Sequence, residues 1–251
     1  MPVPSGIHLR NKTAILYVSG GDHGPKLGRA LSEAGASLFV VARTQHILDA
    51  VLAYVDGDSN SGCVLASPVH ADVEKVMDIF DGTYPSVDVL VNDARSFFTK
   101  PFTEIAADEW QQMQDRNIQI PFILSQQVAL RMLKRKYGRI VNIVSVLAER
   151  GMINGSAFSI TQAALLSLTR SLAVELGSSN IRVNAIGTGW FNSEDVPLDV
   201  QQEELLVRYT PLRRKGVPED IGPLLVYLCS EICDYATGQP VYIDGGLNAH
   251  P

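Results

Sequence analysis

Short strand-like segments alternate with helix-like segments along the whole chain of 251 residues. The strand-like segments are apolar at consecutive positions, as in Thr13–Val18, Ser37–Ala42 and Val87–Val91. Continuously apolar strands separated by helices are typical of a parallel sheet that is covered on both faces. The sequence therefore predicts an α/β fold, and in such sheets ligands bind beyond the carboxyl ends of the strands, at the topological switch point.

The predicted elements form one domain that spans residues 1–251. The other expected strands are Cys63–Ala66, Arg139–Ser145, Ile181–Ile186 and Pro240–Asp244. The expected helices are Leu27–Ala34, Gln45–Val55, Val73–Phe80, Asp108–Lys136, Ser156–Leu176 and Pro218–Cys229. Because proline disrupts a helix interior, the long helix is expected to be interrupted near Pro121. No linker or solenoid repeat divides the chain.

Composition excludes several classes of function. A formal net charge of −6 disfavours non-specific nucleic-acid binding. The three cysteines, Cys63, Cys229 and Cys233, lack a metal-binding pattern, and their small number favours a reducing compartment. No apolar run reaches the roughly 18 residues of a membrane-spanning helix. We expect a cytoplasmic protein with a small-molecule substrate and without a nucleic-acid, membrane or metal partner.

A glycine-rich segment, Ser19–Gly28, follows the first expected strand and precedes the first expected helix. Glycines in this position let a ligand phosphate approach the backbone closely, and the helix N-terminus attracts negative charge. A glycine loop alone is a weak signal, but this one has the strand-to-helix context that a dinucleotide site requires.

The order and spacing of several motifs resemble the short-chain dehydrogenase/reductase superfamily along almost the whole chain. The motifs are Val87–Asn92, Tyr137–Ser145, Ile181–Ala185 and the tail from Thr237 to Gly246. The resemblance implies a Rossmann-type doubly wound sheet of about seven parallel strands, with helices on both faces. It also implies a homotetramer.

The resemblance implies a nicotinamide cofactor, with the glycine loop and Arg43 as parts of its binding site. Ser19, Gly20 and Gly24 match the glycine pattern of the family, but Lys26 stands at its last glycine. The Lys26 side chain could pair with a phosphate or obstruct it. Arg43, at the end of the second strand, stands where NADP-dependent relatives carry a basic residue for the 2′-phosphate; the alternative is a solvated surface arginine.

The resemblance implies two further cofactor positions. Asp72, followed by Val73, resembles the pair that contacts adenine in the family. Asn92 begins the sequence Asn-Asp-Ala-Arg where Asn-Asn-Ala-Gly is usual. Arg95 therefore brings a long cation close to the expected position of the ribose and the nicotinamide.

The catalytic positions depart most from the family. Asn117 and Ser145 match its asparagine and serine, but Phe158 and Gln162 stand at its tyrosine and lysine. Carbonyl reduction needs a proton donor, which the tyrosine supplies because the lysine charge lowers its pKa. Phenylalanine has no such proton and glutamine no such charge, so the usual mechanism is not expected here.

Several of these departures resemble the halohydrin dehalogenases, a non-redox branch that lost the nicotinamide and uses its space for a halide. The segment Thr188, Gly189, Trp190, Phe191 and the following Ser193-Glu194-Asp195 resembles their halide pocket. The alternative is that the two aromatic rings only cap the sheet. Phe158 and Gln162 match neither the tyrosine nor the arginine of that branch.

The sequence leaves three functions open. The favoured hypothesis is a dehalogenase-like enzyme that acts on small halohydrins or epoxides with no cofactor. The alternatives are a catalytically silent member that serves binding or oligomer assembly, and a divergent NADP-dependent oxidoreductase. His23 in the glycine loop is a candidate base because histidine titrates near neutrality, although a surface role is the simpler interpretation.

Overall fold

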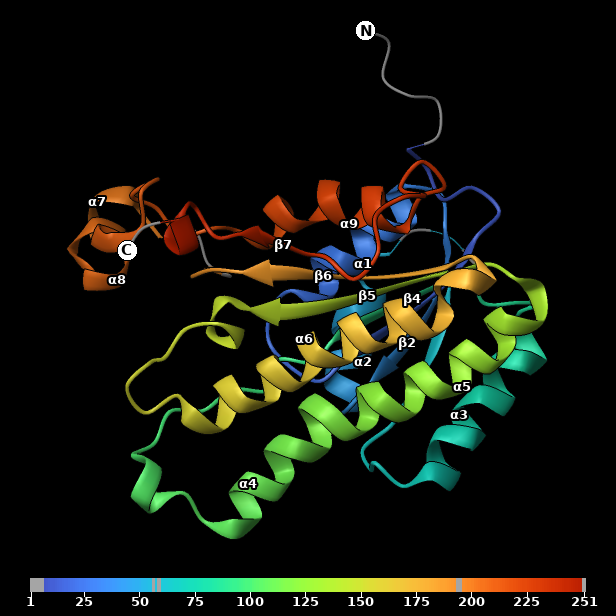
Figure 1. Cartoon of the computed structure of the whole chain (residues 1–251), viewed down its shortest axis with the longest axis horizontal. Helices are drawn as coiled ribbons and strands as arrows, with labels where there is room; N and C mark the ends of the chain where they lie inside the picture. Colours follow the sequence, from blue (N-terminus) through green and yellow to red (C-terminus); the bar gives the residue numbers. More distant parts are fainter. Residues whose placement is uncertain (1–6, 56, 58–59, 193–195, 250–251) are drawn as a thin grey trace, which may run out of the picture.

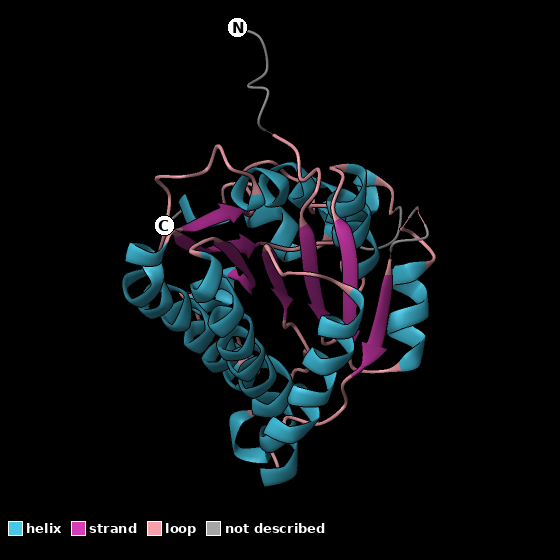
Figure 2. Ribbon diagram, turned by 90° about the vertical axis from the view of Figure 1, so that its right-hand side faces the viewer, coloured by secondary structure: helices cyan, strands magenta, loops and turns pink. Residues whose placement is uncertain are grey.

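The computed structural model describes residues 7–55, 57, 60–192 and 196–249. Its centre is a seven-stranded parallel sheet in the order β3-β2-β1-β4-β5-β6-β7. The strands are β1 (Thr13–Val18), β2 (Ser37–Ala42), β3 (Ser61–Val64), β4 (Val89–Asp93), β5 (Gly138–Ser145), β6 (Ile181–Thr188) and β7 (Pro240–Ile243). Helices cover both faces of this sheet (Figures 1 and 2). The prediction of a doubly wound α/β fold with about seven parallel strands is confirmed.

Two hydrophobic cores lie on opposite faces of the sheet. One face is covered by α1 (Gly24–Glu33), α2 (Gln45–Leu52) and α9 (Gly222–Cys229), and the other by α3 (His70–Thr83), α5 (Ile120–Arg135) and α6 (Ser156–Leu176). The remaining helices are α4 (Ala107–Gln114), α7 (Leu198–Glu203) and α8 (Leu205–Tyr209). Single 3₁₀ turns occupy Phe102–Glu104, Val146–Ala148, Gly177–Ser179, Pro218–Ile221 and Leu247–Ala249. Burial on both faces explains why the strands are continuously apolar.

The chain order reverses between β1 and β4. After β3 the chain crosses to the far side of β1 and continues outward through β4 and β5. The carboxyl ends of β1 and β4 therefore border the crevice where doubly wound sheets bind ligands. The glycine-rich segment follows β1, and Ala94 and Arg95 follow β4, so both lie at this switch point.

The long predicted helix is interrupted, as expected, but by a π-helical segment. This segment, Asp115–Gln119, joins α4 to α5, and Pro121 follows in the first turn of α5. Proline has no N–H to donate there, and π-helical turns inside α-helices are frequent at functional sites. The interruption holds Asn117 fully buried.

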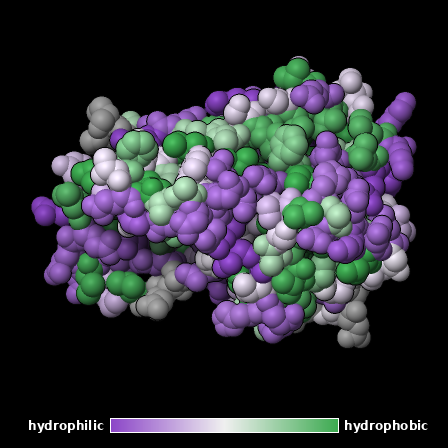
Figure 3. All heavy atoms as spheres, turned by 90° about the horizontal axis from the view of Figure 1, so that it is seen from below, coloured by the Kyte–Doolittle hydropathy of each residue, from purple (hydrophilic) through white to green (hydrophobic). Residues whose placement is uncertain are grey.

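By length and composition alone, the helical stretch Ser156–Ser179 could cross a membrane. In the structure, α6 packs along β5 and β6, and residues such as Leu165, Leu166 and Ala173 belong to the core. Its apolar composition is therefore that of a core helix. Seen from below, the surface of the molecule mixes apolar and polar side chains (Figure 3).

Candidate functional site

The glycine loop leaves its backbone open at the end of β1. A side chain added at Gly20 or Gly21 would meet no atom within 4 Å, and Gly21 has a φ of +85°, which favours glycine. Ser19 fixes the start of the loop, because its Oγ accepts hydrogen bonds from the backbone N–H groups of Arg95 and Ser96 at 2.9 and 3.1 Å. The loop thus presents bare peptide groups beside the N-terminus of α1, which is the arrangement that binds phosphate.

Two other glycines let α1 pack closely. A Cβ at Gly24 would lie 2.8 Å from a Val18 methyl group, and one at Gly28 would lie 3.0 Å from a Val51 methyl group. Gly28 therefore contributes the close packing that the family assigns to its last glycine. Sequence reasoning missed Gly28 because Lys26 occupies the expected position.

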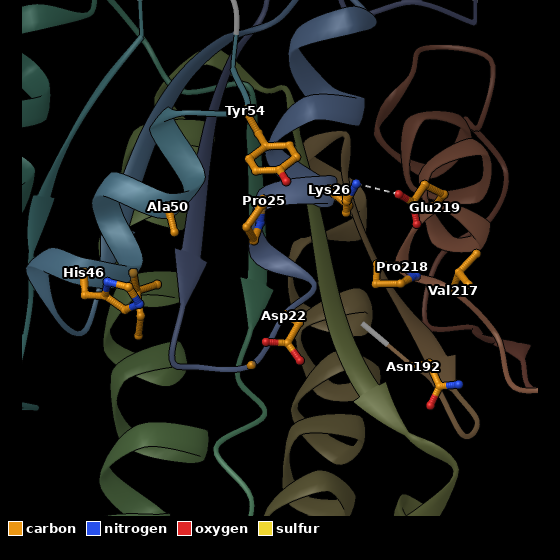
Figure 4. A pocket seen from close by; sticks show the side chains of 12 residues that line it. Asp22, Pro25, Lys26, His46, Ala50, Tyr54, Asn192, Val217, Pro218 and Glu219 are labelled. Carbon is orange, nitrogen blue, oxygen red and sulfur yellow. Dashed lines mark ion pairs between the residues drawn. The ribbon is translucent and has the colours of Figure 1, made fainter. Parts of the chain in front are cut away.

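Lys26 is engaged away from the glycine backbone. Its Nζ forms a 2.7 Å ion pair with Glu219 and lies 5.0 Å from the centre of the Tyr54 ring. Figure 4 shows the Lys26 and Glu219 side chains pointing toward each other, and both line a cavity of about 640 Å³. Gly21 and Asp22 of the glycine loop also line this cavity.

Arg43 lies directly beside the glycine loop. Its backbone N–H donates to the Val18 carbonyl at 3.2 Å, and its Nε donates to the Ser19 carbonyl at 3.0 Å. The two terminal nitrogens of this half-buried guanidinium have no recorded partner in the part of the chain that the structure describes. They are free to bind an anion at the carboxyl end of β2.

The other two predicted cofactor residues have different surroundings. The buried Asn92 amide donates to Ser125 Oγ at 3.2 Å and to Asn142 Oδ1 at 2.8 Å, so it links β4 to α5 and β5. Asp72 lies exposed in the first turn of α3, where it accepts a 2.9 Å bond from Lys75. The Lys75 ammonium lowers the pKa of Asp72. The structure thus brings Ser19, Gly20, Gly24 and Arg43 together, whereas Asp72 is engaged with its own helix.

A buried ion pair forms one wall of the switch-point crevice. Arg95 Nε contacts Asp93 Oδ1 at 2.6 Å, with 12% of the arginine side chain and none of the aspartate side chain exposed. Arg95 Nη1 lies 3.4 Å from His23 Nε2, and the His23 ring packs against Phe191 with 5.1 Å between centroids. The Arg95 guanidinium, which is expected near the ribose and the nicotinamide, is therefore held by Asp93 and His23.

His23 is fixed in its neutral form. Burial, with the Arg95 charge as a second cause, lowers the pKa of His23 to about 2. A guanidinium only donates hydrogen bonds, so His23 Nε2 is the acceptor and Nδ1 carries the proton. Among the residues that the structure describes, that Nδ1 has no hydrogen-bond partner. A general base that titrates near neutrality is therefore not available at His23.

The low pKa of His23 should make stability fall in acid. Since the folded pKa lies below the unfolded value of roughly 6.5, the stabilisation is complete above that pH and is lost as pH falls, at about 1.4 kcal/mol per pH unit. We expect the free energy of unfolding, measured in urea, to decline more steeply between about pH 6.5 and 4.5 in the wild type than in a His23→Asn variant. Parallel declines would show that His23 titrates normally.

Asn117 and Ser145 lie at the ends of neighbouring elements. Asn117 binds the backbone of Ser96 through both ends of its amide, at 2.9 and 2.8 Å, and donates to Thr161 at 3.1 Å. Ser145 ends β5, and its Oγ accepts from the Leu147 N–H at 3.2 Å, which leaves the hydroxyl proton free to donate. Asn117 therefore holds the loop after β4, and Ser145 faces the cavity that follows.

Phe158 and Gln162 both have structural partners. The Phe158 ring is 5% exposed and meets Phe97 edge to face, with centroids 4.9 Å apart. Gln162 is fully buried; its Oε1 accepts from the Ser145 N–H at 3.1 Å and its Nε2 donates to the Ala94 carbonyl at 3.0 Å. The amide bridges the ends of β4 and β5, and no proton donor replaces the family tyrosine at position 158.

These side chains border a cavity of about 400 Å³ at the carboxyl edge of the sheet. Its walls include Gly20, Gly21, His23, Arg95, Ser145, Phe158, Thr188, Gly189, Trp190 and Phe191. The predicted pocket segment thus lies with Ser145 and Phe158, although its Ser193-Glu194-Asp195 portion falls outside the described residues. The volume suits a small organic molecule. The polar groups that face it, such as the Ser145 hydroxyl, can hold a substrate oxygen.

The catalogued relatives of this chain are oxidoreductases. The family described as enoyl-(acyl carrier protein) reductase matches residues 24–248. A 3-oxoacyl-[acyl-carrier-protein] reductase of Aquifex aeolicus is 29% identical over 96% of this chain and 99% of its own length. Dehydrogenase/reductase SDR family member 4 of Homo sapiens is 30% identical over 95% of this chain and 88% of its own length.

Solved structures give the same result. A gluconate 5-dehydrogenase of Burkholderia cenocepacia, in complex with NADP and tartrate, superimposes with a TM-score of 0.87. It is 26% identical, and the match covers 98% of each chain.

These relatives overturn two predictions. The favoured function, a dehalogenase-like enzyme for halohydrins or epoxides, is wrong because the relatives are named as oxidoreductases. The prediction of no cofactor is also wrong, since a neighbour that matches nearly the whole chain holds NADP. Both predictions combined the irregular loop with the departures at Arg95, Phe158, Gln162 and the Trp190 segment, yet the loop backbone remains open at Gly20 and Gly21. The chain belongs to the short-chain dehydrogenase/reductase superfamily.

Proposed function

We propose that this protein is a divergent NADP-dependent oxidoreductase that acts on a small carbonyl compound or the corresponding alcohol. The observation that carries the proposal is the open backbone at Gly20 and Gly21 beside the anion-binding end of Arg43. Peptide N–H groups at a helix N-terminus favour a pyrophosphate, and a basic residue after the second strand favours the 2′-phosphate of NADP. Arg43 thus has the NADP-selecting position rather than a purely surface role.

The cavity beside the glycine loop would hold the reacting centre. When bound, NADP(H) would supply or accept the hydride. The Ser145 hydroxyl, which has a free proton, would donate a hydrogen bond to the substrate oxygen. Asn117 and Gln162 would keep the loop after β4 and the end of β5 in place. Because Phe158 has no hydroxyl, the proton for the substrate oxygen would come from water in the cavity.

A catalytically silent, cofactor-binding role is the second candidate. It is favoured by the use of both ends of the Gln162 amide in a structural bridge and by the packing of Phe158 on Phe97. Such a protein would bind NADP(H) without turnover. Single-turnover measurements of hydride transfer with a panel of keto and hydroxy acids distinguish the two functions. Transfer to or from any of these compounds supports the oxidoreductase, and cofactor binding without transfer supports the silent role.

The assembly expected for this superfamily also has a candidate surface. Along α5 and α6, the half-exposed apolar side chains of Phe122, Leu130 and Ile160 lie on the outer face, and a cavity of about 420 Å³ separates the two helices. We propose that a second copy of this chain covers this face in a homotetramer. Sedimentation velocity tests the mass of the assembly.

Calorimetric titration with NADPH and NADH tests the cofactor proposal. We expect NADPH to bind more tightly than NADH, and Arg43→Glu to weaken NADPH binding by roughly 10- to 100-fold, the scale of one lost charge-assisted contact. The matched control is Arg10→Glu, an equal charge change at an exposed residue before β1. Wild-type protein that binds neither nucleotide would refute the proposed function.

A further inference from the structure

Besides Arg43, a second arginine, Arg116, is held at the carboxyl end of β1. Arg116 belongs to the π-helical segment, and its carbonyl accepts a 3.1 Å hydrogen bond from the hydroxyl of Tyr17, the penultimate residue of β1. Arg43 is held to the next two residues of the same strand end, Val18 and Ser19. The backbone of Arg116 and the guanidinium of Arg43, 73 positions apart in sequence, are therefore anchored to neighbouring residues at the end of β1 and directly after it.

Both arginines keep spare donors. Arg43 uses only Nε, and Arg116 uses only Nη2, which donates to the Gln112 side chain at 2.8 Å. Neither forms an ion pair with any residue in the described ranges of the chain. Four other partly or fully buried arginines, Arg95, Arg131, Arg139 and Arg182, pair with a carboxylate, and the partly buried Arg150 donates to the Leu247 carbonyl. A guanidinium offers five N–H donors, so most of the donors of Arg43 and Arg116 remain for a ligand.

The two positive charges also act on each other. Burial, followed by the charge of Arg43, lowers the pKa of Arg116. The nearby carboxylate of Asp93 is already paired with Arg95, and that of Asp115 accepts from Gln111 at 2.8 Å. Neither guanidinium has a direct ion pair among the described residues, so a bound anion would relieve the repulsion between the two charges.

We propose that Arg116, together with Arg43, forms a two-guanidinium site for the phosphate monoester on the adenosine ribose of NADP. The inference rests on the proposed function and adds Arg116 to it as a residue that determines cofactor specificity. A phosphate monoester carries nearly two negative charges and three acceptor oxygens, which two planar guanidinium groups can share. The pyrophosphate has its own place at Gly20 and Gly21, so the two anionic parts of one cofactor would occupy separate sites.

Binding of nucleotide fragments isolates the contribution of Arg116. Adenosine 2′,5′-bisphosphate carries the proposed phosphate and lacks the nicotinamide, whereas 5′-AMP lacks that phosphate. We expect Arg116→Gln to weaken the bisphosphate about tenfold and to change 5′-AMP affinity less than twofold. Arg116→Lys, which keeps the charge but loses the planar fork, should give an intermediate loss. Arg10→Gln, at an exposed residue before β1, is the control for the loss of one charge.

A double variant tests whether the two arginines share one phosphate. If both bind the same group, the combined loss in Arg43→Gln/Arg116→Gln should differ from the product of the single losses. The proposal would be overturned if Arg116→Gln weakened the binding of 5′-AMP and of the bisphosphate equally, or weakened neither. NADPH binding by the wild type would still support the proposed function in either case. Wild-type protein that binds no NADPH would refute both. A thermal melt of each variant verifies that it is folded.

Discussion

Replacing Phe158 by tyrosine and Gln162 by lysine in one chain is expected to raise the rate of carbonyl reduction by about 10²- to 10⁴-fold, the range of general acid catalysis. The remaining parts are in place: Phe158 borders the same 400 Å³ cavity as Ser145, and Asn117 holds the loop after β4. A lysine one turn further along α6 would lower the pKa of the new tyrosine. The measurement is NADPH consumption with a panel of keto acids.

The single variants are the matched controls for this gain. Phe158→Tyr alone gives a hydroxyl whose pKa is not lowered, and Gln162→Lys alone loses the acceptor for the Ser145 N–H and buries a charge. We expect the second single variant to melt at a lower temperature without a gain in rate, since an unsatisfied buried donor costs about 1–3 kcal/mol. A folded double variant that binds NADPH but reduces none of the substrates would favour the silent, cofactor-binding role.

Much of the fold could be predicted because local signals and burial agree. The predicted bounds of β1, β2 and α6 coincide with the observed ones, Thr13–Val18, Ser37–Ala42 and Ser156–Leu176. The strands are buried on both faces, so hydrophobicity alone marks them. Glycines flank α6 at positions 155 and 177 and thereby mark its ends.

The elements that were missed depend on contacts distant in sequence. Helix α7 (Leu198–Glu203) buries no side chain, so no apolar pattern marks it. The α7–α8 region is held instead by Lys215, whose N–H donates to Gln201 at 2.9 Å and whose ammonium pairs with Glu204 at 2.6 Å. Sequence periodicity does not report such tertiary contacts.

The residues of the candidate site that follow strand ends could be predicted from motifs. The partners of its long side chains could not, because these side chains contact residues distant in sequence. Ser145 and the segment from Thr188 to Phe191 share one cavity, as expected from their strand ends. Asp72, which is expected at the adenine, lies in the first turn of α3, which begins at His70 rather than at Val73, and an acidic side chain there suits the helix dipole. The partners of Lys26 and Arg95 could not be predicted, since both long side chains find their counterions through the folded geometry.

The buried pair of Asp93 and Arg95 gives the largest expected effect on stability. Asp93→Asn leaves a guanidinium that is 12% exposed without its counterion, and Arg95→Gly leaves a fully buried carboxylate without one. Removing one partner of a buried ion pair costs about 3–5 kcal/mol. We therefore expect each single variant to lose about that much free energy of unfolding, measured by urea denaturation.

The double variant Asp93→Asn/Arg95→Gly should be more stable than either single variant, because it removes both buried charges together. It also recreates the Asn-Asn-Ala-Gly sequence that is usual in this superfamily. The Ser19 hydroxyl would still accept from the backbone N–H at position 95, so the glycine loop would keep its anchor. If the losses in free energy of unfolding of the two single variants simply added in the double variant, the 2.6 Å contact between Asp93 and Arg95 would contribute no pairwise stabilisation. A recovery would instead show that Arg95 is tolerated in the cofactor crevice because Asp93 neutralises it.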